Sequence, residues 1–228
     1  SSQEFDYLVT ETSIPSYYYD LSLLKKISKD RIPIILCGPN SEIYNTDFLK
    51  EHAFIDFVLY GEYEFTLLEL ILAIQEGEDL FNIPGLIYSG HDQIRKNLSR
   101  PLCDINLLPW PYRDGLPMHK YLDAPGEMNT PSVQMVASRG CPFTCAFCYN
   151  HAKAKLYKGK GHFVRTRNVD DCISEMKKAR TLYPRMRGVI LQNDILGIDK
   201  KWVAEFSALY ADTIALPWFG SVRPDMID

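Results

Sequence analysis

The feature that most constrains the fold is the alternation of short apolar runs with longer helical runs in the first hundred residues. Residues 32–36 are continuously apolar and end at Cys37-Gly38-Pro39, which is typical of a strand buried in a parallel sheet. Such alternation with short connections predicts a parallel sheet covered by helices. Strands are expected at 5–10, 32–36 and 55–60, helices at 17–30, 46–52 (Thr46 near its N-cap) and 65–75, and a hairpin at 85–89 and 93–98 around Gly90-His91-Asp92.

Composition is that of an ordinary globular protein. The 228 residues are 46% hydrophobic and 24% charged, enough for one large domain or two modest ones. A net charge of −4 gives no reason to expect nucleic-acid binding. No apolar run approaches the roughly 18 residues of a membrane span, and the first residues lack a signal pattern. We expect a cytoplasmic protein that binds neither nucleic acid nor membrane.

Prolines interrupt the alternation in the middle of the chain. Residues 101–117 contain four of them, which disfavours both helix and central strand. We therefore place a first domain at 1–100, a proline-rich linker at 101–128 and a second domain at 129–228.

The second half resumes the alternation of strands and helices. Strands are expected at 132–137, 188–192 and 214–220, and helices at 168–183, with Asn168 as its N-cap, and 200–210. Three strands and two helices cannot close a barrel.

Three of the six cysteines fall in one short segment. A chain of this size and apolar content needs no disulfide bridges, so the scattered cysteines are expected to be small buried hydrophobic residues. Those scattered residues are Cys37, Cys103 and Cys172, whereas Cys141, Cys145 and Cys148 follow an expected strand with the spacing C-x3-C-x2-C.

This spacing favours an iron–sulfur cluster. Soft thiolates select zinc, Cu(I) or iron–sulfur clusters. A zinc site needs four ligands, for which His151 or His162 would have to serve, and no second cysteine pair is present. A 4Fe–4S cluster normally takes four cysteines, so three would leave one iron open for a non-protein ligand. A structural zinc site and a purely electron-carrying cluster remain the alternatives.

The segment from Cys141 to Cys148, C-P-F-T-C-A-F-C, resembles the signature of radical S-adenosylmethionine enzymes. The resemblance implies that S-adenosylmethionine chelates the open iron. It also implies that one electron, from a donor such as flavodoxin or ferredoxin, produces a 5′-deoxyadenosyl radical that attacks a small-molecule substrate. Phe147 matches the family's aromatic residue near adenine, with simple loop packing as the alternative.

Positions after the later strands extend the resemblance. Asn193 and Asp194 follow the second strand of this half, where the family holds the methionyl amine. Ser221 and Arg223 follow the third strand, where the family contacts ribose and carboxylate. For all four residues an ordinary solvated loop is the alternative. Six basic residues and no acidic ones lie in 153–167, which is most simply a solvated loop, or else screens the cluster or binds an anionic substrate.

Residues 5–128 resemble the cobalamin-binding domain that precedes the barrel in one class of these enzymes. The resemblance implies that small and polar residues after parallel strands approach the cofactor. For Glu62 and Glu64 we favour a capping role at a helix N-terminus, where the helix dipole stabilises acidic side chains. The matching stretches are 10–13, 36–40, 56–66, 83–88 and 108–114, and the cobalamin contacts implied are Thr10, Thr12, Ser13, Gly38, Gly61 and Glu62.

The chain departs from this class in three respects. Cys37-Gly38 stands where two glycines are common, and Asn40 stands where a histidine is frequent. The D-x-H-x-x-G segment that supplies a cobalt ligand in many cobalamin proteins is absent. The chain begins inside the first domain and ends after the third barrel strand, so we expect an interior piece of a longer protein or one that has lost both ends.

These observations predict an α/β protein. They indicate a partial Rossmann-like cobalamin-binding domain followed by the first part of a radical S-adenosylmethionine (β/α) barrel. The expected activity is cobalamin-dependent methyl transfer to an unactivated carbon. An oxidative cyclase or rearrangement enzyme of the same class, and a non-catalytic iron–sulfur or zinc protein, are the alternatives. No side chain is assigned a catalytic role.

Overall fold

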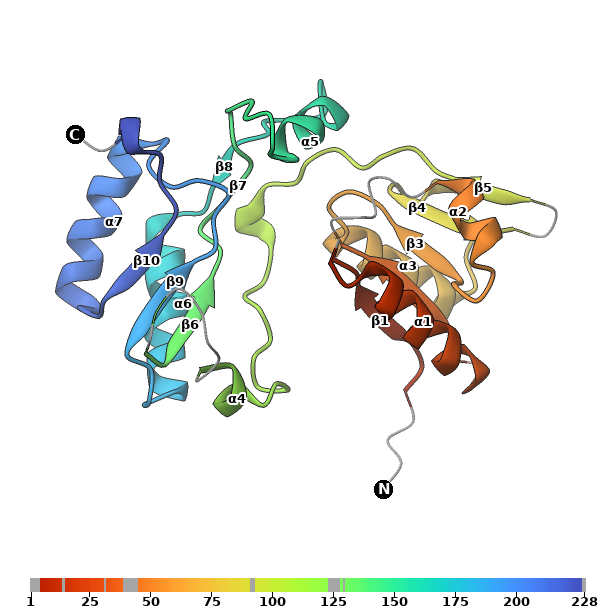
Figure 1. The fold of residues 1–228 in the computed structure, drawn as a ribbon, viewed down its shortest axis with the longest axis horizontal. Coiled ribbons are helices and arrows are strands. Elements are labelled where there is room, and N and C mark those ends of the chain that lie inside the picture. Colours follow the sequence, from red (N-terminus) through yellow and green to blue (C-terminus); the bar gives the residue numbers. More distant parts are fainter. Residues whose placement is uncertain are drawn as a thin grey trace. The chain divides into compact units, whose positions relative to one another are not determined.

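The chain divides into two compact units, Ser1–Pro101 and Leu102–Asp228 (Figure 1). The computed structural model describes residues 5–13, 15–30, 32–38, 45–90, 93–122, 128 and 130–226. The expected separation of a linker at 101–128 from a domain at 129–228 stays a prediction.

The first unit is a five-stranded sheet in the order β1-β2-β3-β4-β5. The first three strands are parallel and the last two antiparallel to their neighbours. The elements are β1 (Leu8–Glu11), α1 (Tyr17–Ile27), β2 (Ile34–Cys37), α2 (Thr46–Glu51), β3 (Phe57–Leu59), α3 (Glu64–Glu76), β4 (Leu86–Ser89) and β5 (Ile94–Lys96), with short 3-10 helices at Ser28–Asp30 and Leu80–Asn82.

Both faces of this sheet are covered by helices, as the continuous apolar run in β2 predicts. All four residues of β2 are buried, and they alternate between two hydrophobic clusters. Ile34 and Leu36 pack in the cluster that contains residues of α1 and α2, whereas Ile35 and Cys37 pack in the cluster of α3.

Thr46 lies next to the N-cap of α2, as expected. The cap itself is Asn45, whose Oδ1 atom accepts the backbone N–H groups of Asp47 (3.0 Å) and Phe48 (2.9 Å). The predicted features at Pro39, Asn40 and His91-Asp92 lie outside the described residues.

The second unit contains a three-stranded parallel sheet in the order β10-β9-β6 and a two-stranded antiparallel ribbon of β7 and β8. Its elements are α4 (Met118–Leu122), β6 (Ser132–Met135), β7 (Ser138–Arg139), α5 (Asn150–Leu156), β8 (Arg165–Thr166), α6 (Val169–Leu182), β9 (Gly188–Leu191), α7 (Lys200–Thr213) and β10 (Trp218–Gly220), with 3-10 helices at Ile105–Leu107 and Pro224–Met226.

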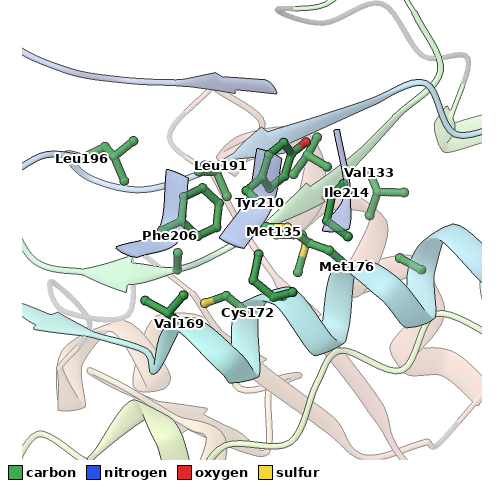
Figure 2. Packing of buried hydrophobic residues seen from close by; sticks show 14 of the residues in the cluster. Val133, Met135, Val169, Cys172, Met176, Leu191, Leu196, Phe206, Tyr210 and Ile214 are labelled. Carbon is green, nitrogen blue, oxygen red and sulfur yellow. The ribbon is translucent and has the colours of Figure 1, made fainter. Parts of the chain in front are cut away.

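The core of this unit lies between the sheet and the helices α6 and α7 (Figure 2). Met135 of β6 and Leu191 of β9 meet Met176 of α6 and Phe206 of α7, and all four are buried. The ring of Phe206 stacks on Trp202 with centroids 4.8 Å apart. This packing fixes the carboxyl ends of β6 and β9, from which the cysteine loop and residues 192–199 emerge.

Two predictions for the second unit are wrong in part. The strand expected at 214–220 begins only at Trp218, because α7 continues to Thr213 and Ala215 adopts a φ of 51°. Residues 153–167, expected to be a solvated loop, contain most of α5 and all of β8. Arg165 within them donates to the Cys103 carbonyl oxygen at 2.7 Å.

Among the described residues, none of the helices combines the length and the apolar character that crossing a membrane requires.

Candidate functional site

The three clustered cysteines lie on the loop that joins β7 to α5. All six cysteines of the chain are free thiols, and Cys141, Cys145 and Cys148 are each half-buried. Cys148 donates its backbone N–H to the Cys145 carbonyl oxygen at 3.0 Å, which closes a turn between the second and third thiols. Within the described ranges, no three or more His, Cys, Asp or Glu side chains are grouped so that they could hold a metal ion. In a cubane cluster each thiolate binds a different iron, so the three sulfur atoms need not converge on one point.

A single carboxylate holds both ends of this loop. Asp194 Oδ2 accepts the backbone N–H of Gly140, directly before Cys141, at 2.7 Å. Asp194 Oδ1 accepts the side-chain amide N–H of Asn150, the first residue of α5, at 2.9 Å. Asn150 is buried, with 4% of its surface exposed. Asp194 therefore sets the distance between the two ends of the cysteine loop.

Gly140 fits its position only because it lacks a side chain. Its φ of 86° lies in the left-handed region, and a Cβ atom there would lie 2.1 Å from the Phe163 carbonyl oxygen. Phe163 precedes β8, whose pairing with β7 places this carbonyl against the start of the loop. Gly140 and the β7–β8 ribbon thus support the loop at its start, before the first of the three cysteines.

Asn193 braces the strand end just before the loop. Its Oδ1 atom accepts the backbone N–H groups of Ala137 (2.9 Å) and Ser138 (3.1 Å). Its buried Nδ2 atom has no hydrogen-bond partner among the described residues. Asp194 thus contacts the cysteine loop and Asn193 contacts the segment just before it, through oxygen atoms that accept from the protein backbone and Asn150.

Arg223 is the other predicted residue that reaches the loop. Its guanidinium carbon lies 3.9 Å from the ring centroid of Phe143, between the first two cysteines. Its Nε and Nη2 atoms donate to the carboxylate of Asp225 at 2.9 and 2.8 Å. These hydrogen bonds are the main cause that raises the pKa of Arg223, and the nearby Cys145 and Cys141 thiols add to it.

Two further predicted residues stay exposed. Phe147 exposes 94% of its surface, so packing within the loop does not explain it. Ser221 is exposed and its carbonyl oxygen accepts the Leu196 N–H at 2.8 Å.

The residues predicted to bind cobalamin gather at one edge of the first unit. Thr10, Gly38 and Gly61 lie in or after β1, β2 and β3, and these parallel strands end at the same edge of the sheet. Thr10 Oγ1 lies 3.3 Å from the Glu11 carbonyl oxygen. Gly38 and Gly61 have φ values of 101° and 82°.

The remaining three predicted cobalamin contacts differ in exposure. Thr12 is 1% exposed, whereas Ser13 is exposed and pairs its hydroxyl with Ser16 Oγ at 2.7 Å. Glu62 lies half-buried just before α3, and Glu64 occupies the first turn of that helix, where the helix dipole favours a negative charge.

Two residues that sequence reasoning missed cover part of this edge. The Tyr63 hydroxyl donates to Glu11 Oε1 at 2.6 Å. Glu11 also lies close to Gly38, because a Cβ atom added to Gly38 would be 3.1 Å from the Cβ atom of Glu11. Burial raises the pKa of the neighbouring Cys37 thiol to about 12. Cys37 is thus a protonated thiol at neutral pH, as expected for a buried hydrophobic cysteine.

A cavity of about 210 Å³ lies beside β6 in the second unit. Its lining includes Arg113 of the proline-rich segment, Arg167 and the buried Glu175 of α6. Glu175 forms ion pairs with Arg113 (2.7 Å) and Arg167 (2.6 Å). The two arginines also donate to the carbonyl oxygens of Gln134 and Val136, so they bind the free edge of β6 and hold the proline-rich segment beside it.

Local patterns carry weak signals for the residues that sequence reasoning missed. Gly140 is a glycine next to a cysteine motif, which indicates a special backbone conformation. Asn150 carries no local pattern, because its partner Asp194 lies 44 residues away. Glu175 has one partner eight residues away, Arg167, and one distant partner, Arg113.

The chain is similar to known proteins in sequence and in fold. No family model matches the chain. It is 30% identical over 221 residues to a protein of Pyrococcus horikoshii described as an uncharacterized methyltransferase, an alignment that covers 95% of this chain and 46% of the relative. It is 28% identical over 209 residues to the anaerobic magnesium-protoporphyrin IX monomethyl ester cyclase of Synechocystis, covering 87% of this chain and 38% of the relative. The chain thus spans less than half the length of these relatives.

Solved structures identify the fold. The radical S-adenosylmethionine methyltransferase TsrM from Kitasatospora setae, with tryptophan and a cofactor analogue bound, matches all of this chain and 45% of its own with a TM-score of 0.76 and 16% identity. The cobalamin-dependent radical enzyme OxsB matches 84% of this chain and 26% of its own with a TM-score of 0.61 and 15% identity. The chain has the fold of these cobalamin-dependent radical S-adenosylmethionine enzymes.

Proposed function

We propose that this chain is the cofactor-binding part of a cobalamin-dependent radical S-adenosylmethionine enzyme that transfers a methyl group to an unactivated carbon. The observation that carries the proposal is the cysteine loop itself. Three half-buried thiols follow β7, and Asp194 and Gly140 hold the loop in place. Such a loop fits a 4Fe–4S cluster with one iron left for S-adenosylmethionine.

In this proposal Cys141, Cys145 and Cys148 hold the cluster. When bound, the cluster and S-adenosylmethionine supply a 5′-deoxyadenosyl radical. Arg223 places a positive charge beside the loop, where it stabilises thiolates and anionic ligands. Phe147 offers an exposed aromatic ring to the adenine of S-adenosylmethionine.

The two residues after β9 also position the cysteine loop. Both carboxylate oxygens of Asp194 hold the loop, and Asn193 Oδ1 holds the preceding strand end. A carboxylate has lone pairs beyond two accepted hydrogen bonds, and the buried Asn193 Nδ2 has no hydrogen-bond partner among the described residues. Asn193, Asp194 and Ser221 therefore stay candidate contacts of S-adenosylmethionine.

Cobalamin is assigned to the carboxyl edge of the first unit. Gly38 and Gly61, with φ values of 101° and 82°, lack side chains, and small residues after parallel strands let a flat macrocycle approach the sheet edge. Thr10, Ser13 and Glu62 supply polar groups at that edge, whereas Thr12 is buried. These small and polar residues fit a cobalamin edge, and Glu11 with Tyr63 would form its border.

Oxidative cyclisation is the second candidate activity, because a magnesium-protoporphyrin cyclase is among the relatives. The substrate would be a small molecule in either case, as tryptophan is in the TsrM structure. Retention of cobalamin during anaerobic purification, read from its visible spectrum, separates cobalamin-dependent chemistry from radical chemistry in which the first unit binds a substrate or a partner instead. It does not separate methyl transfer from cyclisation, because both activities belong to the class with a cobalamin-binding domain.

Electron paramagnetic resonance tests the proposal directly. The chain is reconstituted with iron and sulfide without oxygen, reduced with dithionite and measured with and without S-adenosylmethionine. We expect a 4Fe–4S signal whose g values change when the cofactor is added. A signal that ignores the cofactor would support an electron-carrying cluster, and a colourless protein that binds zinc would support the structural zinc alternative.

A further inference from the structure

A residue that follows β10 contacts the middle of the cysteine loop, away from the two loop ends that Asp194 holds. The guanidinium carbon of Arg223 lies 3.9 Å from the ring centroid of Phe143, close enough for a cation–π contact. Phe143 stands midway between Cys141 and Cys145 in the sequence and is half-buried. Arg223 therefore meets the loop between the first two of its three thiols.

The guanidinium of Arg223 is held by a second partner. Its Nε and Nη2 atoms donate to the two carboxylate oxygens of Asp225 at 2.9 and 2.8 Å, the two-pronged geometry that arginine favours. Asp225 lies in the 3-10 helix Pro224–Met226. A lysine at position 223 would keep the positive charge but could not form both hydrogen bonds in this geometry. Phe143 and Asp225 together set the place and the orientation of the guanidinium.

The positive charge of Arg223 acts on the cysteines. The Cys145 and Cys141 thiols interact electrostatically with the guanidinium, whose pKa is raised mainly by its hydrogen bonds to Asp225. An arginine stays protonated under all ordinary conditions. Two of the three proposed cluster ligands thus lie next to a permanent positive charge.

A permanent positive charge beside a redox centre favours the state that carries more negative charge. Reduction adds one electron, so the cluster with its three thiolates becomes more negative by one charge. That electron comes from an external one-electron donor, which is itself oxidised by one electron. The charge near an iron–sulfur cluster is among the factors that set its reduction potential. Because the Arg223 side chain is 39% exposed, water and salt screen part of this effect.

We propose that Arg223, held in place by Phe143 and Asp225, raises the reduction potential of the cluster and so makes the cluster easier to reduce. This inference rests on the proposed function. Phe143 and Asp225 are positioning residues, because they act through Arg223. Loss of the charge should change the equilibrium between reduced and oxidised cluster about tenfold, which corresponds to about 59 mV for a one-electron couple.

Redox titration of the reconstituted chain tests this proposal. The cluster is titrated with dithionite and mediators without oxygen and without S-adenosylmethionine, and the reduced fraction is read from its electron paramagnetic resonance signal. Arg223→Gln removes the charge, Arg223→Lys keeps it, and Phe143→Leu removes the aromatic ring but leaves an apolar side chain. The matched control is Arg187→Gln, which removes one positive charge from the same unit at an exposed position just before β9, at the amino end of the strand.

We expect Arg223→Gln to lower the potential by about 59 mV and Arg223→Lys to lower it less. Phe143→Leu should lower it in the same direction, by less than Arg223→Gln, and Arg187→Gln should leave it unchanged. Salt at about 1 M should shrink the difference between Arg223→Gln and the unaltered chain, because salt screens an exposed charge. A difference that came only from a distorted loop would not respond to salt in this way.

Three results would overturn the proposal: no shift in Arg223→Gln, an equal shift in Arg187→Gln, or equal losses in Arg223→Gln and Arg223→Lys. If Arg223→Gln fails to fold or to assemble a cluster, an unchanged potential in Phe143→Leu overturns it instead. A cluster that responds to S-adenosylmethionine while its potential ignores Arg223 refutes this inference alone. A cluster whose potential follows Arg223 while its signal ignores S-adenosylmethionine refutes the proposed function alone. Failure of the unaltered chain to assemble any cluster refutes both.

Discussion

Replacement of Gly140 by alanine is the sharpest test of how the cysteine loop is held. The new Cβ would lie 2.1 Å from the Phe163 carbonyl oxygen, more than 1 Å closer than such atoms ordinarily approach. The φ of 86° adds a cost of about 1–2 kcal/mol for any residue with a side chain. Forcing the neighbouring carbonyl aside adds about 1–3 kcal/mol, as overpacking does elsewhere.

The total destabilisation of the folded state is about 2–5 kcal/mol. The net loss of stability is smaller by about 0.4–1 kcal/mol, because alanine also restricts the conformations of the unfolded chain. To relieve the contact, either Phe163 or residue 140 must move. Movement of residue 140 breaks the hydrogen bond from its backbone N–H to Asp194. We therefore expect Gly140→Ala to lower the free energy of unfolding by a few kcal/mol and to lower the iron bound after reconstitution.

Gly159→Ala is the matched control. Gly159 lies in the same unit with a φ of 77°, and no atom of the described residues lies within 4 Å of its added Cβ. It therefore carries the backbone cost without the steric contact. Urea denaturation gives the stability, and iron and sulfide analysis gives the cluster content. If the two variants lose the same stability and both keep full iron, the contact with Phe163 does not support the loop and our reasoning is wrong.

Three further predictions concern the second unit. Asp194→Ala should lower the iron content after reconstitution, while circular dichroism shows the unloaded chain still folded. Asp194→Asn should keep part of the iron, because its amide oxygen still accepts one hydrogen bond. Full iron content in both variants would contradict the role of Asp194 in holding the loop. Glu175→Ala should destabilise the chain by about 3–5 kcal/mol in urea, because Arg113 and Arg167 lose a buried partner, whereas the exposed Asp170→Asn should change little. Burial raises the pKa of the Cys172 thiol from 9.0 to about 12, so the stability that this shift contributes is complete below pH 9 and is lost as the pH rises towards 12. In Cys172→Ala, the free energy of unfolding should therefore fall less steeply between pH 9 and pH 12. An unchanged slope in this range would contradict the prediction.

Local patterns were sufficient for most of the secondary structure. The run at 32–36 became β2, and the helical face of Leu21 and Leu24 packs on the core as α1. The expected N-cap Asn168 also precedes α6. Each of these depends on neighbouring residues alone, which is why the sequence indicates them.

Predictions failed where distant segments decide the local conformation. The strand expected at 214–220 is shortened because Ile214 is fully buried at the end of α7, where the Arg180 side chain donates to its carbonyl oxygen at 2.7 Å. The positive charge of segment 153–167 predicts a solvated loop. It is ordered instead by pairing of β8 with β7 and by the contact of Arg165 with Cys103.

The candidate site divides in the same way. The spacing of the three cysteines, their place after a strand and the polar residues after later strands are local facts, and the sequence alone was enough to predict a cluster loop and its neighbours. The hydrogen bonds of Asp194 to Gly140 and Asn150 join segments that lie 54 and 44 residues apart. Only the tertiary structure determines that Asp194 positions the loop, because a carboxylate binds whichever donors the folded chain brings within reach.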